Sequence, residues 1–87
     1  MEKPVGVMLF QGMANDPHAL RKLVALNIRI KRVELDITQE ELAHRAELSQ
    51  AYLSGIERNK RSPSIDTIQR IADALGMLAH DLLRPRP

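Results

Sequence analysis

The stretch that decides the fold is TQEELAHRAELSQAYLSGIE, residues 38–57. It holds two predicted helices of about eight residues, each preceded by a hydroxyl residue suited to cap a helix start. Thr38 and Glu41 fit a capping box, in which the hydroxyl accepts from the N–H of Glu41 and the carboxylate reaches back to the N–H of Thr38. Ser49 caps the second helix. Because only residues 47–48 separate the helices, their spacing predicts a helix-turn-helix.

Helical periodicity also precedes this unit. A helix is expected from Pro17, with Asp16 as its cap, to about Asp36. Its apolar residues recur at spacings of three and four, which is the period of one helix face. This expected stripe consists of Leu20, Leu23, Val24, Leu26, Ile28, Ile30, Val33 and Leu35.

Two further helices are expected after the unit. Ser64 caps the first, which ends at Gly76, and a short last helix covers residues 79–83. Inward positions are expected in the second helix at Leu42, Ala43 and Ala46, and in the third at Leu53 and Ile56. The apolar set of the fourth helix is Ile65, Ile68, Ile71, Ala72 and Leu75. Since no stretch alternates like a strand, the predicted fold class is all-α with five helices.

Length and composition limit the possible classes. The 87 residues make one domain, with 1–16 interpreted as an N-terminal arm, 17–84 as the domain and 85–87 as a tail. The chain has no cysteine, which excludes disulfides, zinc fingers and thiol catalysis. It also has no run approaching the roughly 20 apolar residues of a membrane span, and no convincing signal peptide. A cytoplasmic protein is expected.

The polar residues suggest a polyanion as partner rather than a catalytic or metal site. His18, His44 and His80 lack the spacing of metal ligands, and no nucleophile lies beside a base, so neither an enzyme nor a cofactor or metal is expected. Basic residues flank an acidic middle segment, which favours a polyanion over a lipid surface. Solvated helix faces are the alternative. The basic residues are Arg21, Lys22, Arg29, Lys31 and Arg32, then Arg58, Lys60 and Arg61.

Residues 20–83 resemble the lambda-repressor-like, Xre-type helix-turn-helix regulators of bacteria and phages. The resemblance rests on five features in the right order and spacing: the capping box, the Ser49 cap, and the blocks YLSGIE, NKRSPS and RIADALG. It implies a five-helix DNA-binding domain whose second and third helices form the helix-turn-helix.

The same resemblance implies which residues read bases. Gln50, the second residue of the recognition helix counted from Ser49, matches the main reader and can pair with adenine. Ala51 could touch a thymine methyl, Tyr52 could reach a base or pack on the preceding helix, and Ser54 could contact the groove. At Gly55 the family often has a polar reader. The glycine of this chain leaves two interpretations: its backbone closely approaches DNA or a neighbouring helix, or the glycine is simply tolerated at this position.

Other roles also follow from the resemblance. The expected phosphate contacts are Gln39, Ser49, Arg58, Lys60 and Arg61. Arg32 and Glu57 match a partly buried salt bridge that orients the recognition helix. Where Asp36 and Glu47 stand, family members often carry glycine, so a positive φ at either would be mildly strained.

Sequence-specific binding by this family generally requires two copies. A homodimer on a palindromic operator in double-stranded DNA is therefore expected, acting as a repressor or autoregulator. Its expected interface is Met77, Leu78, Leu82 and Leu83, which are apolar for a chain end. RNA polymerase is a possible further partner. The alternative is an antitoxin that uses residues 1–16 to neutralise a toxin protein. The resemblance does not separate phage, restriction–modification, mobile-element and antitoxin regulators.

Overall fold

The computed structural model describes residues 16–85 of the chain. This part contains the α-helices α2 (Ala19–Glu34), α3 (Gln39–Arg45), α4 (Gln50–Glu57) and α5 (Ile65–Leu75), and the 3₁₀-helix η1 (Ala79–Leu83). The expected all-α fold is confirmed for the described residues, but the expected fifth α-helix is a single 3₁₀ segment. No helix here is long and apolar enough to cross a membrane. Residues 1–15 of the expected arm and residues 86–87 of the expected tail lie outside the described residues.

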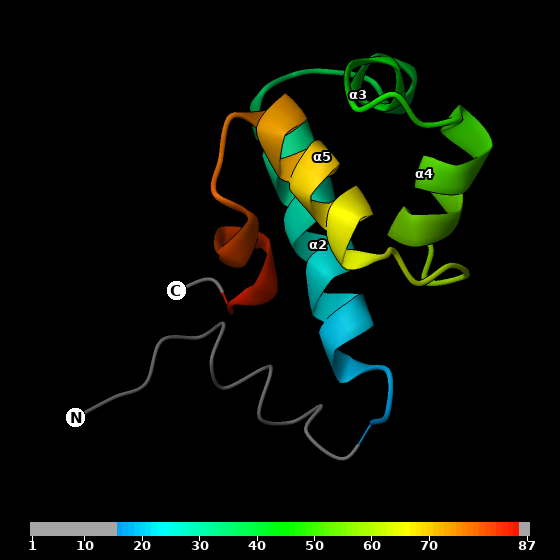
Figure 1. Ribbon diagram of the computed structural model, residues 1–87, viewed down its shortest axis with the longest axis vertical. Coiled ribbons are helices and arrows are strands. Elements are labelled where there is room, and N and C mark those ends of the chain that lie inside the picture. Colours follow the sequence, from blue (N-terminus) through cyan, green and yellow to red (C-terminus); the bar gives the residue numbers. More distant parts are fainter. Residues whose placement is uncertain (1–15, 86–87) are drawn as a thin grey trace.

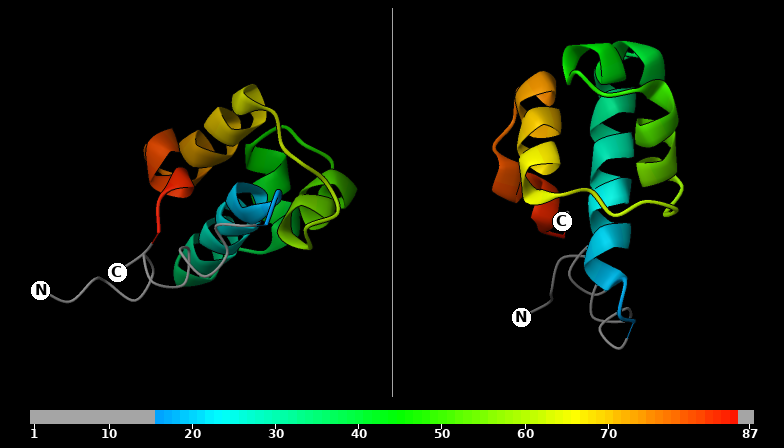
Figure 2. Two further views of the ribbon diagram at one scale, coloured as in Figure 1. Left: turned by 90° about the horizontal axis from the view of Figure 1, so that it is seen from below. Right: turned by 45° about the vertical axis from the view of Figure 1, so that its right-hand side comes forward.

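The long helix α2 lies at the centre of the molecule (Figure 1). α5 and η1 lie along one side of it, while α4 lies on the opposite side and α3 spans the top (Figure 2). α3 contacts both α4 and α5, and η1 contacts both α2 and α5. The helix-turn-helix unit is therefore held against a three-part base formed by α2, α5 and η1.

The core fills the space between these helices. Ile28 of α2, Leu42 of α3, Leu53 and Ile56 of α4, and Ile71 of α5 are completely buried. The core also contains small buried residues, and these are Ala43, Ala46 and Ala72. The inward positions expected around α3 are confirmed, because Leu42, Ala43 and Ala46 are all buried.

The buried face of α2 is narrower than its apolar pattern predicted. Leu20, Leu26, Val33 and Leu35 are 42–61% exposed, and Ile65 at the start of α5 is 85% exposed. Neighbouring helices cover only part of the circumference of α2, so an apolar residue on the uncovered part meets solvent. One core position of α2 is instead occupied by a polar residue, Asn27, which is buried.

Three of the four α-helices begin at the expected caps. The hydroxyls of Thr38, Ser49 and Ser64 each accept a hydrogen bond from the N–H three residues later, at 3.0–3.1 Å. The expected reciprocal half of the capping box is not formed, because the Glu41 carboxylate binds Arg45 one turn along α3 instead. An exposed carboxylate gains more from a nearby guanidinium than from an N–H that water can reach.

α2 begins two residues later than predicted. Asp16 carboxylate oxygen Oδ1 accepts from the N–H of His18 at 2.8 Å, and its main-chain oxygen accepts from the N–H of Ala19 at 3.0 Å. These bonds form a turn, so His18 becomes the residue before the helix and has no side-chain cap bond. Asp16 thus stabilises the start of α2 from one turn away.

Four helix ends use a left-handed residue. Gly76 follows α5 with φ 69°, as predicted. Asp36, Glu47 and Asn59 stand two residues beyond α2, α3 and α4, with φ of 56°, 58° and 63°. The positive φ considered for Asp36 and Glu47 is present, whereas Asn59 was not anticipated. Each of these residues turns the chain sharply at the end of its helix, so that the next element can take a new direction.

Candidate nucleic-acid interface

The first turn of α4 is exposed at the edge of the molecule. Ser49 and the helical residues Gln50 and Ala51 are all exposed. With Ser49 as cap, Gln50 is the first helical residue and Ala51 the second. Tyr52 is half-buried and packs on the core, and Ser54 is half-buried as well. Of the residues predicted to read bases, Gln50 and Ala51 thus have the freest side chains.

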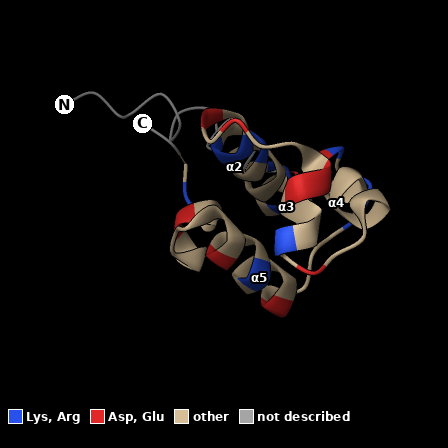
Figure 3. Ribbon diagram, turned by 90° about the horizontal axis from the view of Figure 1, so that it is seen from above, with Lys and Arg blue, Asp and Glu red and all other residues tan. Residues whose placement is uncertain are grey.

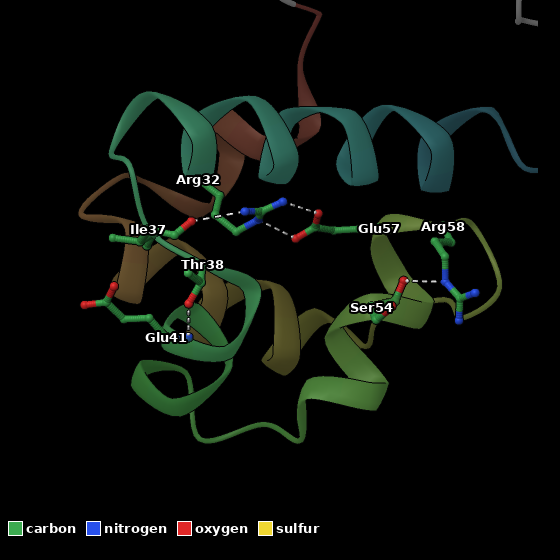
Figure 4. Close-up of polar contacts among 7 residues, drawn as sticks. All are labelled: Arg32, Ile37, Thr38, Glu41, Ser54, Glu57 and Arg58. Atoms are coloured by element: carbon green, nitrogen blue, oxygen red, sulfur yellow. Dashed lines mark hydrogen bonds and ion pairs between the residues drawn. The ribbon is translucent and has the colours of Figure 1, made fainter.

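The inner face of α4 is fixed to α2 by an ion pair (Figure 4). Arg32 Nε and Nη2 donate to the two carboxylate oxygens of Glu57 at 3.0 and 3.1 Å. The third nitrogen, Nη1, donates to the main-chain oxygen of Ile37 at 3.0 Å. The side chains are only 16% and 3% exposed. The structure therefore brings Arg32 and Glu57 together across the helix interface, and the same guanidinium also binds the segment entering α3.

The turn between α3 and α4 has a support that the sequence did not indicate. Arg70 of α5 donates through Nη2 to the main-chain oxygen of Glu47 at 2.6 Å, and the Glu47 carboxylate lies 4.0 Å from the same nitrogen. A side chain from α5 thus holds the residue with left-handed backbone. Only the folded chain places these positions together, so no local pattern could have shown the contact.

The predicted phosphate-binding residues lie on both sides of α4's exposed turn. Gln39 is the first residue of α3 and is half-buried, while Arg58, Lys60 and Arg61 are exposed in the loop after α4. Along α3 and α5, in contrast, acidic and basic residues follow one another (Figure 3). The loop after α4 therefore carries three exposed basic side chains with no acidic residue among them.

These polar side chains differ in how far they are already engaged. The Ser49 hydroxyl accepts from the N–H of Tyr52 at 3.1 Å and keeps its own hydrogen available. Arg58 Nε donates to the main-chain oxygen of Ser54 at 3.4 Å, a long bond at the end of α4. Both residues can contact a phosphate while keeping these bonds.

Gly55 has a packing role that the sequence left open. A Cβ placed there would lie 2.7 Å from Cγ of Arg61, closer than real Cβ contacts. The aliphatic part of Arg61 therefore covers this glycine, and the loop, rather than a neighbouring helix, makes the close approach. The sequence singled out Gly55 and Arg61 separately, but no sequence pattern indicated that the two residues are in contact.

The expected dimer interface is only partly exposed. Leu78 is 62% exposed and Leu83 38%, and Met77 is half-buried. Leu82 is completely buried in the core of its own chain, so its assignment to the interface was wrong. A 3₁₀ turn places only some of its residues outward, and here Leu82 points into the space beside α2.

An apolar groove lies near Leu83. Its lining includes Leu20 at the start of α2, Pro63 in the loop before α5, and Ile68 of α5. The Nε of Arg21, which also lines the groove, is buried and has no hydrogen-bond partner. These residues come from four separate segments of the chain.

Lys22 binds the Asp16 carboxylate and, with the His18 N–H, lowers the pKa of that carboxyl below its ordinary 3.8. Among residues 16–85, no three His, Asp or Glu side chains gather closely enough to hold a metal ion.

A helix-turn-helix family model, HTH_3, matches residues 28–83, which is more than half of the chain. The chain belongs to this family. The matched range covers the helix-turn-helix together with the C-terminal part of α2 and all of α5 and η1. This agrees with the Xre-type resemblance found in the sequence.

Relatives support the same assignment for this helix-turn-helix chain. It is 42% identical over 66 residues to an uncharacterized HTH-type transcriptional regulator, y4dJ, of Sinorhizobium fredii, covering 76% of this chain and 86% of that protein. It is 38% identical to the control protein C.BamHI of Bacillus amyloliquefaciens, covering 74% and 80%. The crystal structure of a hypothetical transcription factor from Neisseria superposes with a TM-score of 0.74 at 39% identity, covering 76% of each chain.

Proposed function

We propose that this chain is a sequence-specific regulator of transcription that binds double-stranded DNA with α4 in the major groove. The observation that carries the proposal is the division of α4 into two faces. Its inner face is fixed by the Arg32–Glu57 pair, whereas Gln50 and Ala51 in its first turn are exposed. A rigidly held helix with a free N-terminal turn is the arrangement by which this motif reads base edges.

The proposed contacts follow from the chemistry of the exposed side chains. Gln50 can donate to and accept from adenine through a bidentate pair, and Ala51 can touch a thymine methyl. Tyr52 and Ser54 supplement them at the groove. The phosphate contacts are Gln39, Ser49, Arg58 and Lys60, which surround the exposed turn and set the register without reading sequence.

A palindromic operator requires two copies of α4, about 34 Å apart. We assign the dimer contact to the apolar groove formed with Leu20, Pro63, Ile68 and Leu83, because a second copy would cover side chains that now meet solvent. Of the interface expected from the sequence, Leu83 remains in this proposal. In this dimer, the protein acts as a repressor or autoregulator of the operator it binds.

The first experiment selects bound sequences from a random DNA pool with the wild-type chain and with Gln50→Ala. An inverted repeat should be enriched by the wild type, and adenine at one position in each half-site should be lost with Gln50→Ala. Affinity should fall steeply with salt, because each phosphate contact releases condensed counterions. Failure of the wild type to enrich any sequence would contradict the proposal and would favour a protein partner instead.

The dimer contact is tested by Leu20→Glu, with Leu78→Glu as a matched control. Both leucines are at least half exposed, so each substitution should leave the fold intact. Sedimentation with operator DNA should show two copies bound for the wild type and Leu78→Glu, and one weakly bound copy for Leu20→Glu. Loss of the dimer only with Leu78→Glu would place the interface at the start of η1 instead.

A further inference from the structure

Gly55 is buried although it belongs to the outer face of α4. It follows the exposed Ala51 by four residues, so the two lie on one face of the helix, one turn apart. The cover comes from Arg61, whose Cγ would be 2.7 Å and whose Cβ would be 3.6 Å from a Cβ added at Gly55. On the outer face of α4, the position one turn after Ala51 is thus covered by the side chain of Arg61, which belongs to the following loop and not to the helix.

The backbone of the loop fixes this arrangement. The main-chain oxygen of Gly55 accepts hydrogen bonds from the N–H groups of Lys60 and Arg61, at 2.8 and 3.2 Å. The left-handed Asn59 directs the chain back toward the helix so that both bonds can form. Arg61 therefore leaves a backbone that is anchored to Gly55, and the first part of its side chain lies against that residue.

The charged end of Arg61 is uncommitted. Within residues 16–85 its guanidinium has neither a hydrogen bond nor an ion pair, and the residue is exposed. Arg58 and Arg45, by comparison, bind the Ser54 oxygen and the Glu41 carboxylate. A positioned stem with a free guanidinium is suited to bind a planar acceptor pair.

We propose that Arg61 reads a guanine in the major groove, from the place on α4 that Gly55 leaves empty. The proposal rests on the DNA-binding function above and changes the role of Arg61 from phosphate contact to base reader. The guanidinium fork matches the O6 and N7 acceptors of guanine, and its stem lies on the same face as Ala51 and one turn further along α4. Gly55 is then a positioning residue that acts through Arg61.

The test measures base preference and affinity separately. Operators are selected from a random pool, and the affinity for each variant at the guanine position is measured with the wild type, Arg61→Ala, Arg61→Lys and Lys60→Ala. Arg61→Ala should reduce the preference for guanine at one position about 5- to 150-fold. Arg61→Lys should lose most of the same preference while keeping salt-dependent binding. Lys60→Ala should weaken all sequences equally.

Gly55→Ala tests the positioning role. The added methyl displaces the Arg61 stem, so the same guanine preference should fall without a change at the adenine position read by Gln50. Gly55→Ala with Arg61→Ala should lose no more than Arg61→Ala alone. This double variant has room to fold, because only Cβ of residue 61, at 3.6 Å, then faces the new methyl. Equal melting temperatures for it and Arg61→Ala confirm that the fold is kept.

Two outcomes would overturn this assignment. A uniform loss of affinity across all sequences with Arg61→Ala would identify Arg61 as a phosphate contact. Additive losses from Gly55→Ala and Arg61→Ala would show that the glycine does not act through the arginine. If the wild type enriches no sequence at all, the DNA-binding function itself fails, which is a different result from either of these.

Discussion

Two polar side chains of α2 anchor two different regions of the molecule, the helix-turn-helix unit and the C-terminal segment. The helix-turn-helix unit is held by Arg32, whose three nitrogens all have partners on Glu57 and Ile37. The C-terminal segment is held by Asn27, whose Nδ2 donates to the main-chain oxygens of Leu82 and Arg84, both at 2.9 Å. The Asn27 Oδ1 is buried without a partner. The region proposed to meet DNA thus has the more completely satisfied and more directional attachment.

Glu57→Ala should have the largest effect on stability. It leaves the Arg32 guanidinium partly buried and unpaired, which costs about 3–5 kcal/mol when a buried pair is broken on one side. The melting temperature should fall by about 10 °C or more. Thermal unfolding followed by circular dichroism measures this change. A melting temperature equal to that of the wild type would show that the pair does not anchor α4.

A double variant sharpens this test. Replacing Arg32 by Met together with Glu57→Ala removes both buried charges, so part of the lost stability should return. If the double variant is instead less stable than Glu57→Ala, the bond from Arg32 to the Ile37 oxygen contributes more stability than the unpaired guanidinium costs.

Asn27→Ala should have a smaller effect on stability that is local to the other region. It removes both hydrogen bonds to the C-terminal segment and leaves the buried Leu82 oxygen unpaired, at a cost of about 1–3 kcal/mol. Amide hydrogen exchange should speed up in residues 79–84 while α3 and α4 keep their protection. Equal acceleration in both regions would show that the two attachments are not independent.

Asp16→Asn should have the smallest effect. The charged carboxylate is favoured by Lys22 and the His18 N–H, so its pKa is lowered on folding. A lowered pKa gives stability that is present above the unfolded value and is lost as the pH falls through the folded value. The urea midpoint of Asp16→Asn should therefore lie slightly below that of the wild type at neutral pH and should match it at about pH 2. A constant difference at both pH values would exclude this linkage.

The sequence predicted the features that depend on neighbouring residues. The caps at Thr38, Ser49 and Ser64 follow from side chains that bind a backbone N–H only three positions away. The left-handed Gly76 follows from the lack of a Cβ at that one position. The turn formed by Asp16 is also local, but proline beside it fits both a first helical position and a turn. The local sequence gave no reason to prefer a turn over a first helical residue, so the start of α2 was predicted two residues too early.

Features that depend on distant residues could not be predicted. Leu82 was assigned to the dimer interface because an apolar residue can pack either on a second copy or in the core of its own chain. The sequence alone does not distinguish these two environments. The burial of Asn27, the bond from Arg70 to the Glu47 oxygen and the packing of Arg61 on Gly55 join residues that only the folded chain brings together. Arg32 and Glu57 were paired through the family resemblance, since their separation of 25 residues carries no local signal.

The non-glycine residues in left-handed conformation give this small domain a capacity for evolutionary change. A left-handed backbone costs about 1–2 kcal/mol for a residue with a Cβ, less for Asp and Asn, and glycine avoids that cost. Replacing Glu47 by glycine would remove this conformational cost. Replacing Asn59 by glycine would remove the same cost and also a buried side-chain oxygen that has no hydrogen-bond partner. A lineage that alters the recognition helix at some expense of stability therefore has compensating single substitutions outside that helix, so new DNA specificities can arise without loss of the fold.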